Sequence, residues 1–186
     1  MTADSYYGLT ASQYDDKREG TPGRQKEREA IAQLLGEGRV LDAPVGTGAF
    51  ADLYRTHGGI GIDSSNEMLA ICRRKHKWLR TKRVDMLKPL PFEDDEFATA
   101  LCVRFFWWMP DGDMQRVMAE LRRVSRSVVF SIRISHVYGR PEPVPGKRQR
   151  QTLGHTKEQL AQALDGWRVT DDITVGGAYR VMKAVP

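Results

Sequence analysis

Three aspartates stand where short apolar segments give way to polar turns, and their carboxylates can accept hydrogen bonds from the hydroxyl and amino groups of a ligand. Asp42 follows Val40-Leu41, Asp63 follows the segment 60–62, and Asp85 follows Val84. If these segments are parallel strands, their carboxyl ends meet at one edge of a sheet, where open α/β folds bind ligands. The three carboxylates are therefore the first candidates for a binding site.

The segment from Asp42 to Gly48 predicts a tight turn between a strand and a helix. A side chain at Gly46 or Gly48 would obstruct the approach of backbone N–H groups to a ligand. Asp63 comes 21 residues after Asp42, the spacing at which an acid in this topology meets the hydroxyls of a ribose. Each feature also has a plainer interpretation: a structural turn for the glycines, and a helix N-cap for Asp63, although the two serines after it can also cap that helix.

The third aspartate, Asp85, has neighbours suited to an adenine. An adenine needs an acceptor for its exocyclic amine, a backbone donor for a ring nitrogen, and apolar surface against its faces. Asp85 can supply the acceptor, the Met86 backbone the donor, and Met68 part of the apolar surface. Taken singly, Met68 is more typical of a hydrophobic core.

Strand-like and helix-like segments alternate along the chain, which is the pattern of a parallel sheet with helices on both faces. Capping boxes mark two helix starts, Ser64 with Glu67 and Thr156 with Gln159. The turn at 175–178 predicts a final hairpin, so one strand should be antiparallel. The expected helices are 24–35, 50–55, 65–74, 114–124 and 157–164, and the expected strands are 39–41, 60–62, 83–84, 98–103, 128–134, 167–173 and 179–184.

The totals describe an ordinary globular protein. With 186 residues, 40% apolar and 28% charged, the chain is expected to form one domain over 1–186. No apolar stretch is long enough to span a bilayer, and the charged opening residues do not fit a secretory signal, so we expect a cytoplasmic protein. Its oligomeric state is expected to be a monomer or a homodimer. Cys72 and Cys102 lack CxxC spacing and stand beside no histidine, so no metal site is expected.

Taken together, these segments resemble the class I methyltransferases that use S-adenosylmethionine (SAM). The resemblance rests on the turn 41–48, the segment 61–69, and Asp85 with the Leu90-Pro91-Phe92 that follows it. It covers residues 39–134 closely and the two ends only in architecture. It implies an α/β fold with a single Rossmann-like, doubly wound sheet of seven strands in the order 3-2-1-4-5-7-6, with SAM as cofactor.

The resemblance also implies a role for individual residues. Asp42 would hold the methionine ammonium of SAM, Asp63 its ribose and Asp85 its adenine amine. Pro44 stands where the family usually has its first glycine, and proline offers no N–H to a ligand. The remaining residues of the expected cofactor-binding set are Gly46, Gly48, Ser64, Met68, Met86, Val103 and Arg104.

No motif reveals the methyl acceptor. DNA amino-methyltransferases carry Asn or Asp before Pro-Pro-Tyr or Pro-Pro-Phe after strand four, where this chain has RFFWW at 104–108. Positioning can supply much of the rate of methyl transfer, and a base is needed only for acceptors that lose a proton. Residues 1–23 are expected to form an N-terminal lid and 135–155 a proline-rich loop on the substrate side. Candidates for a base or a substrate contact, each of which could instead be structural, are Tyr14, Arg104, Trp108, His136 and Tyr138.

We therefore expect SAM-dependent methyl transfer to a small-molecule or side-chain acceptor. Two basic runs, 73–83 and 140–150, could instead bind phosphates in an RNA or other nucleic-acid methyltransferase, or could be solvated surface. A non-catalytic SAM-binding partner subunit is a third interpretation. A nicotinamide dehydrogenase would explain Asp42 and Asp63 but leaves Asp85 without a role.

Overall fold

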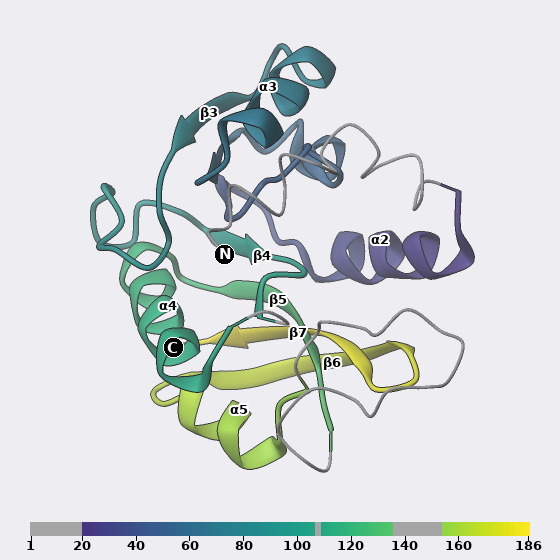
Figure 1. Cartoon of the computed structure of the whole chain (residues 1–186), viewed down its shortest axis with the longest axis vertical. Coiled ribbons are helices and arrows are strands. Elements are labelled where there is room, and N and C mark those ends of the chain that lie inside the picture. The colour runs from purple at the N-terminus through teal and green to yellow at the C-terminus, as the bar shows by residue number, and fades with distance from the viewer. Residues whose placement is uncertain (1–19, 107–108, 136–153) are drawn as a thin grey trace.

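A seven-stranded sheet forms the centre of the protein in the computed structural model, which describes residues 20–106, 109–135 and 154–186 (Figure 1). The order is β3-β2-β1-β4-β5-β7-β6; β1 to β5 pair in parallel, and β7 is antiparallel to both of its neighbours. The predicted order and the single antiparallel strand are confirmed. The strands are β1 (Val40–Asp42), β2 (Gly59–Asp63), β3 (Arg80–Arg83), β4 (Thr99–Cys102), β5 (Val128–Arg133), β6 (Arg168–Gly176) and β7 (Tyr179–Val185).

Helices cover both faces of the sheet. The first face packs against α2 (Pro22–Leu34), the 3-10 helix η2 (Ala51–Tyr54) and α3 (Asn66–Lys75), and the second against α4 (Asp111–Val124) and α5 (Lys157–Ala163). Because side chains alternate along a strand, Val40 of β1 joins the core on the first face and Leu41 the core on the second. Within the described residues, no helix has the length and apolar character needed to cross a bilayer.

Three predicted boundaries were wrong. The third strand is not 83–84 but β3, Arg80–Arg83, whose polar sequence gave no apolar signal although it pairs in parallel with β2 from Ile60 to Asp63. The expected helix 50–55 is the short 3-10 helix η2. The capping box at Ser64 is also wrong, since Ser65 caps α3 by accepting from Met68 N at 3.3 Å. The capping box of Thr156 is confirmed.

The turn after β1 is fastened to the strands on both sides of it. Ala43 N donates to Leu101 O at 2.9 Å, and Val45 N donates to Ile62 O at 2.8 Å. Gly61 of β2 makes this close return possible, because a Cβ added there would lie 2.8 Å from Val45 Cγ2. The sequence of β2 therefore decides how near the turn lies to the sheet.

A methyl group at Gly61 should loosen the turn. We expect Gly61→Ala to lower the free energy of unfolding by about 1–3 kcal/mol, because the added carbon overpacks against Val45. The matched control is Gly112→Ala in α4, where nothing lies within 4 Å of the added Cβ. The free energy of unfolding of this variant should equal that of the wild type or be slightly higher. Urea denaturation measures both, and equal stability of the two variants would contradict the prediction.

Candidate active site

The carboxyl ends of β1, β2 and β4 meet at one edge of the sheet and surround a narrow pocket. Asp42 and Asp63 end β1 and β2 and are buried, and Arg104 lies just beyond β4. Six residues of the predicted cofactor-binding set line the pocket: Pro44, Gly46, Asp63, Met68, Val103 and Arg104. Sequence reasoning missed five further lining residues: Arg24, Val45, Thr47, Ala49 and Phe50.

Asp63 fastens two segments to the end of β2. Its Oδ2 accepts from Gly46 N at 2.9 Å, and its Oδ1 accepts from Ser65 N, also at 2.9 Å. The glycine adopts a φ of +54°, which suits a residue without a Cβ. A carboxylate has about four lone-pair positions, so Asp63 can accept further hydrogen bonds from hydroxyl groups in the pocket. The two interpretations of this residue, helix start and ligand contact, are thus compatible.

Asp42 lies beneath the same turn, and Tyr54 OH donates to its Oδ2 at 2.8 Å. Burial raises the pKa of the Asp42 carboxyl to about 7, the hydrogen bond from Tyr54 acts in the opposite direction, and the charge of Asp63 raises it further. Near neutral pH, the protonated and the ionised forms of the Asp42 carboxyl are therefore both populated. An ammonium group brought close to it would favour the carboxylate.

Five residues of the predicted set lie outside the lining of this narrow pocket: the buried Asp42, described above, and Gly48, Ser64, Asp85 and Met86. Asp85 is exposed beyond β3 and accepts from Leu87 N at 3.0 Å, whereas Met86 is buried in the core beneath α4. Ser64 O accepts from Arg83 Nε at 2.9 Å. Gly48 has a φ of +78°, and a Cβ there would lie 2.9 Å from Cys72 Sγ, so it allows close packing against α3. The cofactor contacts expected of these five residues, and of the six that line the pocket, stay predictions.

A buried ion network forms the wall on the α2 side. Arg104 Nε donates to Glu27 Oε1 at 2.9 Å, its second guanidinium contact is to Glu27 Oε2, and its backbone N donates to Ser131 Oγ at 2.7 Å. Arg24 NH1 lies 3.5 Å from the same fully buried carboxylate, and Tyr179 OH donates to it. Burial, and then the charge of Glu27, raises the pKa of Tyr179 well above its usual range. One carboxylate therefore contacts two guanidinium groups.

Part of this network could have been predicted from the sequence of α2. Arg24 and Glu27 occupy the same helical face as Ile31 and Leu34, and all four are buried in α2. An acid and a base three residues apart, extending an apolar stripe, indicate a paired charge that points inward. The partners Arg104 and Tyr179 are far away in the chain and had no comparable local signal.

The catalytic candidates are only partly described. Tyr14, Trp108, His136 and Tyr138 lie outside the described residues, as does most of the expected lid and of the proline-rich loop. Of the expected lid 1–23, Thr21 caps α2, and Pro22 and Gly23 belong to that helix. Arg104 lines the narrow pocket as expected, but its guanidinium group is hydrogen-bonded to Glu27. Within the described ranges, no cluster of three metal-ligating side chains is present.

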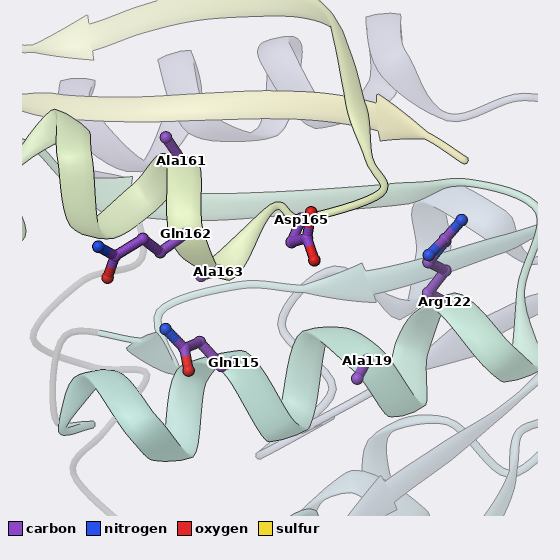
Figure 2. A pocket seen from close by; sticks show the side chains of 7 residues that line it. All are labelled: Gln115, Ala119, Arg122, Ala161, Gln162, Ala163 and Asp165. Carbon is purple, nitrogen blue, oxygen red and sulfur yellow. The ribbon is translucent and has the colours of Figure 1, made fainter.

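Two larger hollows are present. One of about 500 Å³ adjoins the narrow pocket, shares Arg24 and Ala49 with it, and is also lined by Arg28, Lys75 and His76. The other, of about 780 Å³, lies between α4 and α5, and Figure 2 shows Gln115 and Ala119 of α4 facing residues of α5 across it. None of the predicted site residues lines this second hollow, which belongs to the other face of the sheet.

Residues 40–127 match the family model for a methyltransferase domain. The match covers just under half of the chain, so residues 40–127 are similar to a methyltransferase domain. The matched region runs from β1 to just before β5 and contains Asp42, Asp63 and Asp85. SAM is the cofactor of this family of methyltransferases. No curated protein sequence matches the chain.

Solved structures share the fold of this chain along its length. The PH0226 protein of Pyrococcus horikoshii OT3 is 17% identical, with 100% of both chains covered and a TM-score of 0.76. Magnesium protoporphyrin IX methyltransferase of Synechocystis PCC 6803, solved with bound SAM, is 13% identical over 98% of this chain and 94% of the other, with a TM-score of 0.74. DhpI, solved as a complex with SAH, is 19% identical over the same shares, with a TM-score of 0.74.

Removing the charge of Asp42 should stabilise the folded protein at neutral pH and above. The pKa of this carboxyl is raised in the folded state, so the folded protein binds the proton more tightly and stability falls as pH rises from about 4 to about 7. Asparagine keeps an acceptor for Tyr54, so at pH 8 we expect Asp42→Asn to unfold with a free energy higher by up to ~4 kcal/mol. Urea denaturation at pH 5 and pH 8 measures the difference between variant and wild type, and a variant less stable at pH 8 would contradict the prediction.

Removing the charge of Glu27 should have the opposite effect. Glu27→Gln removes the negative charge that contacts both Arg104 and Arg24 in a largely buried place, so we expect a loss of about 3–5 kcal/mol in the free energy of unfolding. Tyr179→Phe removes only one hydrogen bond to this carboxylate and should cost about 2 kcal/mol. Denaturation curves of the two variants give the comparison; a larger loss in the tyrosine variant would show that Glu27 is not the centre of the network.

Proposed function

We propose that the chain transfers the methyl group of SAM to a small-molecule or side-chain acceptor, and that the narrow pocket is its cofactor site. The observation that carries this proposal is the meeting of two buried aspartates and a glycine turn at the ends of β1 and β2. When bound, SAM supplies an electrophilic methyl group on a sulfonium. The residues of this chain bind the cofactor and orient it.

Each part of the cofactor has a chemically suitable partner among these residues. Asp42 can pair with the methionine ammonium, and Arg24, which lines the pocket, can face the methionine carboxylate. The carboxylate of Asp63 is the kind of acceptor that ribose hydroxyls need, and Met68 and Val103 give the pocket apolar walls. Asp85, exposed at the same edge of the sheet, can accept from the adenine amine.

Arg104 acts in this proposal as a wall of the pocket and not as a base, because a guanidinium keeps its proton in proteins. Its φ of +59° is unusual for a residue with a side chain, and the bonds to Ser131 and Glu27 hold it there. Such a fixed position favours catalysis by orientation, which is sufficient for acceptors that need not lose a proton.

The adjoining hollow supports an acceptor of small-molecule size. Its volume of about 500 Å³ lies in the range of ligand pockets, roughly 300–1,000 Å³. It meets the narrow pocket at Arg24 and Ala49, so a molecule held there would lie next to the bound cofactor. Its lining contains the ion pair of Arg28 with Asp52 and also the side chains of Lys75 and His76, so it suits a polar acceptor.

Calorimetric titration of the purified protein with SAM and with NAD tests the cofactor. We expect binding of SAM and no comparable binding of NAD. Asp63→Asn and Asp85→Asn should each weaken SAM binding about tenfold or more, since each removes a charged acceptor. Asp165→Asn, exposed on the other face, is the matched control and should bind SAM as the wild type does.

Tighter binding of NAD than of SAM, in protein shown to be folded by circular dichroism, would overturn the proposal. Equal affinity of the Asp63 and Asp165 variants for SAM would remove Asp63 from the site. The acceptor class is tested by incubating the enzyme with labelled SAM and a cell extract separated into a small-molecule filtrate and a macromolecular fraction. Label transferred only to macromolecules other than proteins would contradict the proposed acceptor.

A further inference from the structure

We propose that the edge of the sheet at β3 is a docking surface for the phosphate backbone of a nucleic acid. Seven cations of α3, β3 and the turn between them are all exposed, and we call them the basic edge. From Met68 to Val84 the sequence contains no aspartate or glutamate. The basic edge consists of Arg73, Arg74, Lys75, Lys77, Arg80, Lys82 and Arg83.

The basic edge wraps around the rim of the sheet. Arg73 of α3 donates to Thr81 Oγ1 at 2.7 Å, so Thr81 points to the face that α3 covers. Side chains alternate along a strand, which places Arg80 and Lys82 on the opposite face. Lys82 Nζ lies 5.9 Å from the ring centre of Phe92, a residue packed against the core of that opposite face. Figure 1 shows β3 and α3 together at the periphery of the molecule. Because the exposed cations of these elements lie on both faces of this rim, they form a ridge.

Acidic side chains do not neutralise the centre of this ridge. Within the described residues, Arg74, Lys77, Arg80 and Lys82 take part in no ion pair. Arginines elsewhere on the surface do have such partners: Arg28 pairs with Asp52, Arg123 with Glu120 and Asp94, and Arg180 with Asp172. The excess positive charge is therefore concentrated at one place and available to an anionic partner.

Protection of an edge strand against aggregation does not explain this distribution. Charged side chains do prevent edge-to-edge pairing, but only those on the strand itself are needed, and acids serve as well as bases. Here four of the seven cations, Arg73, Arg74, Lys75 and Lys77, lie on α3 or in the turn after it. Cations on the helix, the turn and the strand can together contact a negatively charged chain that lies across all three elements.

A phosphate backbone fits this surface better than a bilayer does. A flat membrane would meet one side of a ridge, whereas a flexible chain of phosphates can follow it on both sides. Trp78, the aromatic residue of this segment, packs edge-to-face on Tyr54 and His76 and is half-buried. Base stacking on Trp78 is thereby restricted, so recognition should depend on phosphates and show little base preference.

The ridge leads toward the pocket. Arg83 ends β3, and its Nε donates to the carbonyl of Ser64, the residue directly after Asp63. A nucleic acid held on the basic edge would thus pass beside the proposed cofactor site. Docking itself does not depend on methyl transfer, and it can be measured without SAM.

Fluorescence anisotropy with a labelled polyuridine oligonucleotide tests the inference on the full chain. The first variant changes Arg74, Lys77, Arg80 and Lys82 to glutamine. The matched control changes four exposed cations on other parts of the surface to glutamine, Lys26, Arg126, Lys157 and Arg168, so that both variants lose the same net charge. We expect the first variant to bind at least tenfold more weakly at about 50 mM salt, and the control to stay within about threefold of the wild type.

The salt dependence gives a second measurement. For single strands the logarithm of the binding constant falls with that of the salt concentration by about 0.7 for each phosphate contact, so loss of four contacts should reduce the slope by up to about 2.8. The double variant Arg80→Gln with Lys82→Gln should show about half of this change. SAM titration of the same variants reports separately on the cofactor site and should show wild-type affinity.

Three results would overturn the inference. One is equal weakening in the two four-residue variants, which would mean that only net charge matters. Another is absence of RNA binding by the folded wild type at low salt. The third is stronger binding to phosphatidylserine vesicles or to polyglutamate than to the oligonucleotide, because the partner would then be a membrane or an acidic protein. A failure of SAM binding alone would contradict the proposed function and leave the docking result as measured.

Discussion

The carboxylate of Asp63 is the constraint on which the pocket depends. It is a buried charge, and each oxygen accepts from a backbone N–H, one in the turn after β1 and one at the start of α3. Hydrogen bonds to a charged acceptor are among the strongest that a side chain can make, which offsets the desolvation of the carboxylate. The turn, the helix start and the strand end are thereby held at one point. A ligand that enters the pocket meets a carboxylate that is already fixed in position.

A second buried carboxylate balances the opposite charge. Glu27 brings Arg24 and Arg104 together with Tyr179, so it joins α2 to β7 and to the segment after β4. Asp42 needs no such counter-ion while its raised pKa allows it to hold a proton. The pocket and the residues packed around it therefore contain one fixed carboxylate, Asp63, one set of paired charges around Glu27, and one group that can change its charge, Asp42.

The sequence was sufficient for the parts of the fold that have local signals. Apolar strands, glycine turns and the Thr156 cap indicated the alternation of elements, and the family resemblance supplied the strand order. β3 was misplaced because an exposed edge strand can be entirely polar, and only its pairing with β2 identifies it. The helix start at Ser65 was missed by one residue because Asp63 accepts from the Ser65 N–H, a contact that the capping-box pattern does not contain. The partners of Glu27 are 77 and 152 residues away, beyond the reach of any local pattern.

The position of β7 has a consequence for the order in which the protein can be completed during synthesis. β7 follows β6 in the chain but lies between β5 and β6 in the sheet. The ribosome releases the N-terminal elements first. One edge of β5 therefore has no strand to pair with until β7 has been synthesised. β6 joins the sheet only through its pairing with β7. Tyr179 opens β7 and reaches Glu27. The ion network beside the pocket is thus completed only after the other six strands of the sheet have been synthesised.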